Sequence, residues 1–570
     1  MMKDWIGAFW VCVVAVSLAA CGSDSGTAED AGTGDVAGDT HTAVDVQDET
    51  VAADVGLDTA VEPEVLADIQ SVETTPGLPT GLPFDLNRTD KGEPLTAEEI
   101  TQFTKVVTGF YKNTGFFNWV WWTSHGMHPS HDPDMPDYRL YWQDTQAIKE
   151  GDTIRFVHTG GADNLCIRTG KLTNAAVAGY FMSGGDPMFG RIVEQYAKGF
   201  VALSKGLEWA SEEPVVKYLQ ARAIFTVDHE YEMEGGRKVK VEYGPVKEQE
   251  KFDWNAHTIP NDENPYWGPI WVRSMRSKDD VPHMYRTVPY FRWIADHGET
   301  EEIKEAAALA VEYLSGFAKD IVDSGYYIRT KDKYGNAYIP KKEDGTDNDL
   351  ASFVTYETVI PNGECSGKIS SAYVGYGESL DNDCGLNDHT FYEDMATAGH
   401  YFNTAIIRYL HLAAVLTGLV AGDDEKAKQM LIGAIERADR LMADTKSPPE
   451  HKEWYPDLAA WLLVGAASGL PLTSQEARLV MEQYMASAAH YEGFAYWDPW
   501  DDSVPDGPFN YKPDRDGPAN PDEPDGETIK HIRLPEMGFI LEYCFSPYKN
   551  PNGAPLLDCD IVADPAKWGL

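Results

Sequence analysis

Apolar residues recur at helical spacing along most of the chain from about residue 90 onward. The first segment opens with Thr96-Ala97-Glu98-Glu99, in which a threonine and a glutamate three residues later form a capping box. Ile100, Phe103 and Val107 then follow at intervals of three and four residues. This pattern predicts a helix that begins just after Thr96.

Further segments with the helical period arrive in pairs that are separated by short breaks. Thr473 and Glu476 form a second capping box at the start of one of them. No repeat of fixed length is visible, which disfavours a regular solenoid. We therefore predict a mainly α fold, an (α/α) toroid of helical hairpins, as a single domain over residues 86–570. The predicted pairs are 169–183 with 186–208, 279–297 with 300–323, 391–419 with 423–445, and 456–469 with 473–489.

Long segments rich in Trp, Tyr, His, Asn, Gly and Pro separate these hairpins. They cover residues 116–165, 230–278, 325–390 and 491–530. Segments this long within a compact domain are usually functional, and we expect them to gather at one end of the toroid. Residues 234–244 alternate in polarity, which predicts a small inserted β-hairpin. The Pro-rich tail, 546–570, is expected to be a loop.

The N-terminus has the pattern of an export signal. Residues 1–21 carry one lysine, then an apolar run, and end Leu18-Ala19-Ala20-Cys21. This ending resembles the lipobox of bacterial lipoproteins, a resemblance that implies cleavage before Cys21, lipidation of this cysteine with palmitate among its acyl groups, and anchoring in a membrane. Gly22 follows the cysteine, which by the same resemblance favours the outer membrane. The alternative is an ordinary signal peptide or anchor.

The segment after the signal is strongly acidic. Residues 22–80 hold 14 acidic residues, no Lys or Arg and no aromatic residue, so they cannot bury enough apolar surface to order. We interpret 22–85 as an acidic, disordered stalk. The whole chain has a formal charge of −45, of which −31 lies outside residues 22–80. A chain this acidic is not expected to bind nucleic acid, and the membrane contact is expected only through Cys21.

Cysteine usage fits an exported chain. Cys12 leaves with the signal and Cys21 takes the lipid, which leaves five cysteines, and export permits disulfides among them. The nearest pairs in sequence are Cys365 with Cys384 and Cys544 with Cys559, although four cysteines allow three pairings. Cys166 is then left over.

The stretch 279–291 is amphipathic when it is drawn as a helix. Asp279, His283, Arg286 and Tyr290 fall on one face. Pro289 should kink or end the helix, and Asp279 or Asp280 can cap its start. The polar face is either the wall of an active site or a solvated surface with an internal ion pair. The opposite face carries Val281, Met284, Tyr285, Val288 and Phe291.

Residues 264–278, just before this stretch, are rich in aromatic and basic side chains. Aromatic platforms beside arginine suit sugar rings that bear carboxylates or sulfates, through stacking and paired hydrogen bonds. Asn255 and His257 lie two residues apart and would point to the same side of an extended segment. The alternative is a loop that packs its rings into the core. The candidate ligand-binding residues are Asn255, Tyr266, Trp267, Trp271, Arg273, Arg276 and Arg286, with His257 and His283 as candidate acid–base groups.

Further downstream, His389, Tyr392 and His400 lie on a predicted helix and are interpreted as acid–base groups or as satisfied core residues. A shared metal ion is excluded for the two histidines because eleven residues of helix rise about 16 Å. We expect no cofactor and no metal at the site, and a structural calcium ion stays open. His125, His128 and His131 are spaced three residues apart, and whether they bind a metal is also left open.

Two kinds of chemistry fit an exported helical domain whose long segments carry aromatic, basic and acidic residues. In β-elimination, a uronate carboxylate must be neutralised by Asn, His or Arg while a base removes the neighbouring proton. In kind, the clustered residues resemble those of the (α/α)-toroid polysaccharide lyases, which implies a lyase that acts on an acidic polysaccharide. Glycoside hydrolysis is the alternative, with Asp279 or Asp280 opposite Glu393 or Asp394. A third possibility is a surface lipoprotein that binds glycans without cleaving them.

Overall fold

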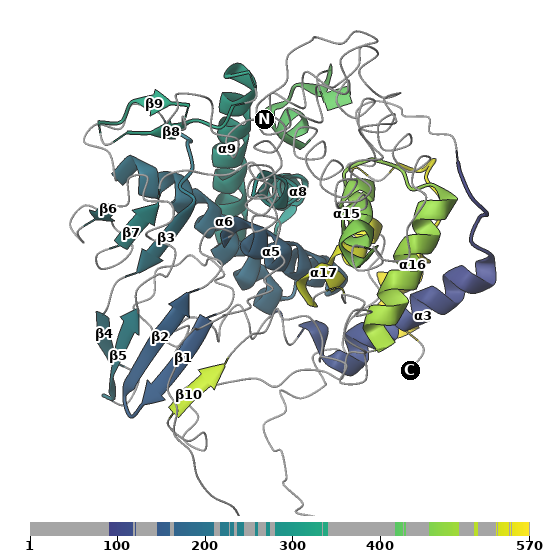
Figure 1. The fold of residues 1–570 in the computed structure, drawn as a ribbon, viewed down its shortest axis with the longest axis horizontal. Helices are drawn as coiled ribbons and strands as arrows, with labels where there is room; N and C mark the ends of the chain where they lie inside the picture. Colours follow the sequence, from purple (N-terminus) through teal and green to yellow (C-terminus); the bar gives the residue numbers. More distant parts are fainter. Residues whose placement is uncertain are drawn as a thin grey trace, which may run out of the picture. The chain divides into compact units, whose positions relative to one another are not determined.

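The computed structural model divides the chain into two units, Met1–Ile69 and Gln70–Leu570, and the residues that it describes lie in the second. They are mostly helical (Figure 1). Among them, no helix is both long enough and apolar enough to cross a membrane. With short internal gaps, the described ranges are 90–120, 145–159, 165–209, 217–243, 257–259, 270–273, 280–339, 416–428, 455–489, 507–510 and 532–568.

Helix α3 (Ala97–Thr114) begins where the sequence predicts. The Thr96 hydroxyl accepts from the Glu99 N–H, and the Glu99 carboxylate accepts from the Thr96 N–H at 2.8 Å. The bond from the Arg478 guanidinium and those from Thr96 lower the pKa of Glu99 to about 2. The helix ends at Gly115, which has a φ of 66° that favours glycine. The capping box therefore sets this boundary, as expected.

Three of the predicted helix pairs are confirmed, and their members contact each other. The second capping box also forms, since the Thr473 N–H donates to Glu476 Oε2 at 3.1 Å and the Glu476 N–H donates to Thr473 Oγ1 at 3.3 Å. The pair 391–419 with 423–445 lies largely outside the described residues. The confirmed pairs are α5 (Leu165–Met182) with α6 (Pro187–Trp209), α8 (Val288–His297) with α9 (Glu301–Asp323), and α15 (Tyr455–Ala467) with α16 (Ser474–Ala489).

The helix predicted over 279–297 is broken in two, α7 (Val281–Tyr285) and α8. Pro289 has no N–H with which to reach the carbonyl of Tyr285, so the helical ladder cannot continue through this point. The chain instead turns at Arg286 and Thr287, where the Thr287 N–H donates to the Met284 carbonyl at 3.1 Å. Pro289 then lies in the first turn of α8, where its missing N–H costs nothing.

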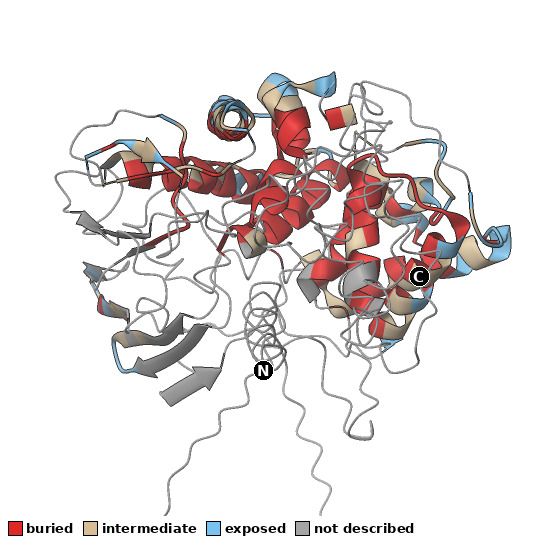
Figure 2. Cartoon of the chain, turned by 45° about the horizontal axis from the view of Figure 1, so that its top comes forward, coloured by how far each residue is buried: buried red, intermediate tan, exposed pale blue. Residues whose placement is uncertain are grey.

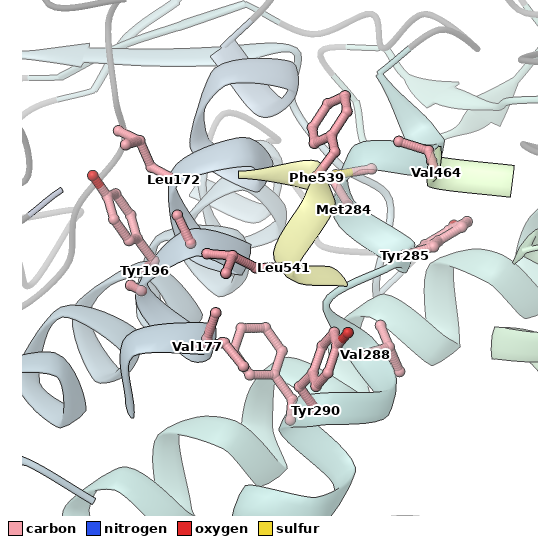
Figure 3. Packing of buried hydrophobic residues seen from close by; sticks show 14 of the residues in the cluster. Leu172, Val177, Tyr196, Met284, Tyr285, Val288, Tyr290, Val464, Phe539 and Leu541 are labelled. Carbon is pink, nitrogen blue, oxygen red and sulfur yellow. The ribbon is translucent and has the colours of Figure 1, made fainter. Parts of the chain in front are cut away.

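One part of the core lies where α5, α7, α8 and α18 (Phe539–Phe545) meet. Leu541 of α18 points toward α5, and Phe539 points toward Val464 of α15 (Figure 3). Leu541 and Phe539 are both buried, and buried residues run along much of the described helices (Figure 2). Gly170 of α5 permits the closest approach, because a Cβ there would meet the His283 carbonyl oxygen of α7 at 2.2 Å.

The C-terminal segment packs against the first described helix. Short helices α17 (Leu534–Met537) and α19 (Cys559–Val562) and a 3-10 turn, η5 (Pro565–Lys567), lie in it. The Tyr111 hydroxyl of α3 donates to the Met537 carbonyl at 2.8 Å, and the Trp568 ring lies 6.2 Å from the Tyr111 ring. The expectation of a loop over 546–570 is therefore wrong in part, because Asp558 and Asp564 cap helical turns there.

The predicted β-hairpin forms between β4 (His229–Glu232) and β5 (Lys238–Tyr243), which pair antiparallel. It starts before residue 234 and belongs to a five-stranded sheet of order β10-β1-β2-β5-β4 (Figure 1). The sheet is antiparallel except between β2 and β5. The other strands of this sheet are β1 (Thr145–Glu150), β2 (Thr153–Thr159) and β10 (Gly507–Asn510).

Two smaller sheets complete the described strands. One has the order β3-β7-β6 and is antiparallel throughout; the other pairs β8 with β9. Helical periodicity does not predict these strands, because each is short and most lie in polar, aromatic-rich segments. The strands are β3 (Ala223–Thr226), β6 (His257–Ile259), β7 (Ile270–Arg273), β8 (Thr330–Lys331) and β9 (Ala337–Tyr338).

Candidate functional site

The polar face predicted for 279–290 is inside the protein. His283 is 1% exposed, Arg286 4% and Tyr290 3%. Of the two alternatives for this face, the solvated surface does not hold for these residues, because α5, α18 and Trp461 of α15 pack around them. The charge of Arg286 on that face is matched by a partner from elsewhere in the chain.

Arg286 is paired with Glu542 of α18. Arg286 Nη2 lies 2.9 Å from Glu542 Oε1, and the guanidinium carbon lies 4.2 Å from the centre of the Phe539 ring. Burial raises the pKa of Glu542 to about 7, against the opposing effects of Arg286 and the Asn174 amide. This carboxyl can therefore hold or release a proton near neutral pH.

A second buried ion pair joins Lys171 of α5 to Glu536 of α17. The Lys171 ammonium lies 5.8 Å from the same Phe539 ring that contacts Arg286. The Tyr484 hydroxyl donates to the Glu536 carbonyl at 2.8 Å, which holds α17 to α16. Lys171, Arg286 and Glu536 each have further interaction partners. Two cations and two carboxylates therefore flank one aromatic ring; Lys171, Asn174, Arg286, Glu536, Phe539 and Glu542 are called the ionic cluster below.

His283 lies next to the ionic cluster, because the Trp461 ring contacts His283 and its centre lies 6.4 Å from that of the Phe539 ring. The His283 ring lies edge-on to Trp461 at 5.3 Å, and its carbonyl lies against Gly170. Asp280 occupies the position before α7 but makes no side-chain cap bond, because its ψ of −29° is helical rather than extended. Asp280 is fully buried. The packing of α5 and α15 against α7 encloses this end of the helix.

Three predicted residues lie in the β3-β7-β6 sheet. His257 is in register with Val272, whereas Trp271 is in register with Thr258 and Phe225. Arg273 is in register with Ala223. Successive residues of a strand alternate between the two faces of a sheet, so the register assigns His257 to one set of positions and Trp271 and Arg273 to the other. The three residues are neighbours in the sheet but do not form one row.

The remaining predicted residues lie outside the described residues, as do the predicted signal and stalk. Within the described ranges, no group of three or more His, Cys, Asp or Glu residues is arranged to hold a metal ion. The Cys544–Cys559 disulfide, one of the pairings that the sequence leaves open, is present, and Cys166 is buried. Outside the described residues are Cys21, Asn255, Tyr266, Trp267, Arg276, Asp279, Cys365, Cys384, His389, Tyr392, Glu393, Asp394, His400 and the histidines at 125, 128 and 131.

Sequence reasoning missed Lys171, Asn174, Glu536 and Glu542. The signal for the two glutamates was present, since residues 534–545 read LPEMGFILEYCF, in which two acids interrupt an otherwise apolar run. Charged residues in such a run are buried and need partners. Which cations supply those partners could not be deduced, because Lys171 lies 365 residues before Glu536.

Comparisons with known proteins do not extend this picture: no family model matches the chain, and no curated protein or solved structure matches it. The chemistry available is that of the residues themselves. A carboxyl with a pKa near neutral lies beside a guanidinium, and a histidine lies one turn before that arginine on α7. Such a set can hold a proton and can compensate negative charge.

Proposed function

We propose that this chain is an exported, lipid-anchored polysaccharide lyase, which cleaves a uronate-containing polysaccharide by β-elimination on an (α/α) toroid. The observation that carries the proposal is the five-stranded sheet. Its strands come from 116–165, 230–278 and 491–530, three of the aromatic-rich segments that separate the helical hairpins. Segments that are far apart in sequence therefore meet, as the walls of one substrate cleft would.

The proposed reaction needs a positive or hydrogen-bonding group at the uronate carboxylate, so that charge developing at C5 is stabilised. Arg273 and Trp271 on β7, with Asn255, Tyr266, Trp267 and Arg276, are proposed to bind the sugar acid. The groups proposed to move the proton are His389, Tyr392 and His400. His257 is not assigned to this step, because the register gives it the opposite set of sheet positions from Trp271 and Arg273.

We assign His283 and Arg286 a positioning role instead of the direct roles that the sequence suggests. Arg286 is already paired with Glu542, and His283 is enclosed by Gly170 and Trp461. A buried guanidinium that left this carboxylate for a substrate would leave an uncompensated charge behind. The ionic cluster instead fixes α7, which begins at Val281, shortly after β7 ends.

A polysaccharide panel tests the proposal. The purified chain is incubated with acidic and neutral polysaccharides, and both ultraviolet absorbance and new reducing ends are followed. Cleavage by β-elimination creates an unsaturated uronate, so absorbance should rise together with reducing ends on an acidic polymer. Absence of both signals on every acidic polymer, with neutral polymers also intact, would count against a lyase.

Glycoside hydrolysis is the second candidate, favoured by one observation. Glu536 and Glu542 are both buried near Phe539, and the pKa of Glu542 is raised to about 7. A carboxyl that keeps its proton near neutral pH is one of the two that acid–base hydrolysis requires. New reducing ends without new absorbance would support this alternative. Binding without cleavage would instead support a surface glycan-binding lipoprotein.

A further inference from the structure

A second charged site lies apart from the ionic cluster, where α6, α9 and β8 meet. Lys331 on β8 is 2% exposed, and its ammonium has no hydrogen-bond partner among the residues that the structure describes. Burial lowers the pKa of Lys331. The Glu208 carboxylate raises this pKa and the Lys205 ammonium lowers it further. Both groups therefore lie near the Lys331 ammonium. A buried amine with no partner indicates a missing ligand or water.

Glu208, a neighbour of Lys331, also has a buried atom without a hydrogen-bond partner among the described residues. Glu208 Oε2 lies 2.8 Å from Lys205 Nζ, while Glu208 Oε1 is buried without a hydrogen-bond partner within the described ranges. Lys205 Nζ also lies 5.2 Å from the centre of the buried Tyr313 ring. The Lys205 and Glu208 side chains are 32% and 16% exposed, so they border solvent while Lys331 lies deeper.

We propose that Lys331, Lys205 and Glu208 bind a small protonated oxyanion, of which inorganic phosphate is the simplest. The two ammonium groups donate to its oxygens, and its own hydroxyl donates to Glu208 Oε1. Two lysines and one glutamate carry a net charge of +1, which a singly charged oxyanion balances. An anion without a proton, such as sulfate, would place an acceptor against the carboxylate and is excluded.

The test measures thermal unfolding of the purified chain in phosphate and in sulfate at equal ionic strength, with affinities from titration calorimetry. Phosphate should raise the unfolding temperature in a saturable way, because a ligand of the folded state stabilises it by mass action. Sulfate should not. Equal effects of both anions, or no effect of phosphate, would overturn the proposal.

Two variants sharpen the test. Lys331→Met keeps the side-chain volume and should weaken phosphate binding at least tenfold. Glu208→Gln adds a donor at this side chain, so this variant should gain sulfate binding. Lys319→Met, which removes an exposed lysine of α9, serves as the control and should bind phosphate like the unaltered chain. Phosphate binding that survives in Lys331→Met, or a Glu208→Gln variant that still rejects sulfate, contradicts the assignment.

Discussion

At the scale of single residues, removing one partner of the Arg286–Glu542 pair should strongly destabilise the fold. Both side chains are 3% exposed, so Arg286→Met leaves a buried carboxylate without its cation. We expect a loss of about 3–5 kcal/mol in the free energy of unfolding, measured by urea denaturation. The double variant Arg286→Met/Glu542→Leu should recover most of this loss.

The control is the ion pair of Arg478 with Glu99, which joins α16 to α3 at 2.7 Å with side chains about one-third exposed. Arg478→Gln should change the free energy of unfolding far less than Arg286→Met does, because water screens an exposed pair. If Arg286→Met costs no more than Arg478→Gln, the buried pair does not hold α7 to α18.

Glu542 also predicts a pH dependence. Its pKa rises from an ordinary value of 4.5 in the unfolded chain to about 7 in the fold. Between these values the unfolded chain has released the proton that the folded chain keeps, so Glu542 lowers stability as the pH rises. The contribution of Glu542 to the free energy of unfolding is highest below pH 4.5. It falls by about 1.4 kcal/mol for each pH unit until the pH passes 7.

The measurement compares the unaltered chain with Glu542→Gln by urea denaturation from pH 4 to pH 8. The free energy of unfolding of the unaltered chain should fall relative to that of Glu542→Gln as the pH rises. A difference that stays constant with pH would show that Glu542 does not titrate in this range.

At the scale of elements, the contact between α5 and α7 depends on Gly170. An added Cβ there would meet the backbone oxygen of His283 at 2.2 Å, so α7 would have to move. We expect Gly170→Ala to destabilise the fold by about 1–3 kcal/mol, as overpacking does. Gly109 of α3 is the matched control, because its nearest neighbour would be 4.0 Å away. Gly109→Ala should stabilise by about 0.5–1 kcal/mol, since alanine favours helix.

The Cys544–Cys559 disulfide ties α18 to α19 across a separation of 15 residues. Closing a loop of this length with a disulfide stabilises the fold by about 3 kcal/mol, because it lowers the entropy of the unfolded chain. The variant Cys544→Ala/Cys559→Ala should lose about that much stability in denaturation without reductant. A variant as stable as the unaltered chain would show that the packing of α18 and α19 suffices alone.

The same elements show what a sequence can and cannot predict. Capping boxes at Thr96 and Thr473 and the break at Pro289 are local chemistry, so the helix boundaries could be deduced. Short strands in polar segments have no comparable local signal, and the five-stranded sheet depends on pairing across hundreds of residues. The buried partner of Arg286 was unpredictable for the same reason, because a helical wheel separates faces but does not say which neighbours cover them.

At the scale of the whole molecule, the proposed lipid at Cys21 predicts where the chain is found. Expressed in a bacterial host and labelled with palmitate, the unaltered chain should incorporate label and sediment with membranes. Cys21→Ala should lose the label and should not be processed before residue 21. Label that persists in Cys21→Ala would show that the lipobox resemblance is misleading.

The bond from the Tyr111 hydroxyl to the Met537 carbonyl spans 426 residues, and the Asp558 N–H reaches Thr104 across 454. Loops this long are entropically costly to close, and folds rich in such contacts form slowly. Helix α3, although it is made early, cannot bury Tyr111 until the last residues have been synthesised. The packing of α3 should therefore be completed only late in synthesis, and until then this helix belongs to the part of the chain that can still pass through a narrow channel.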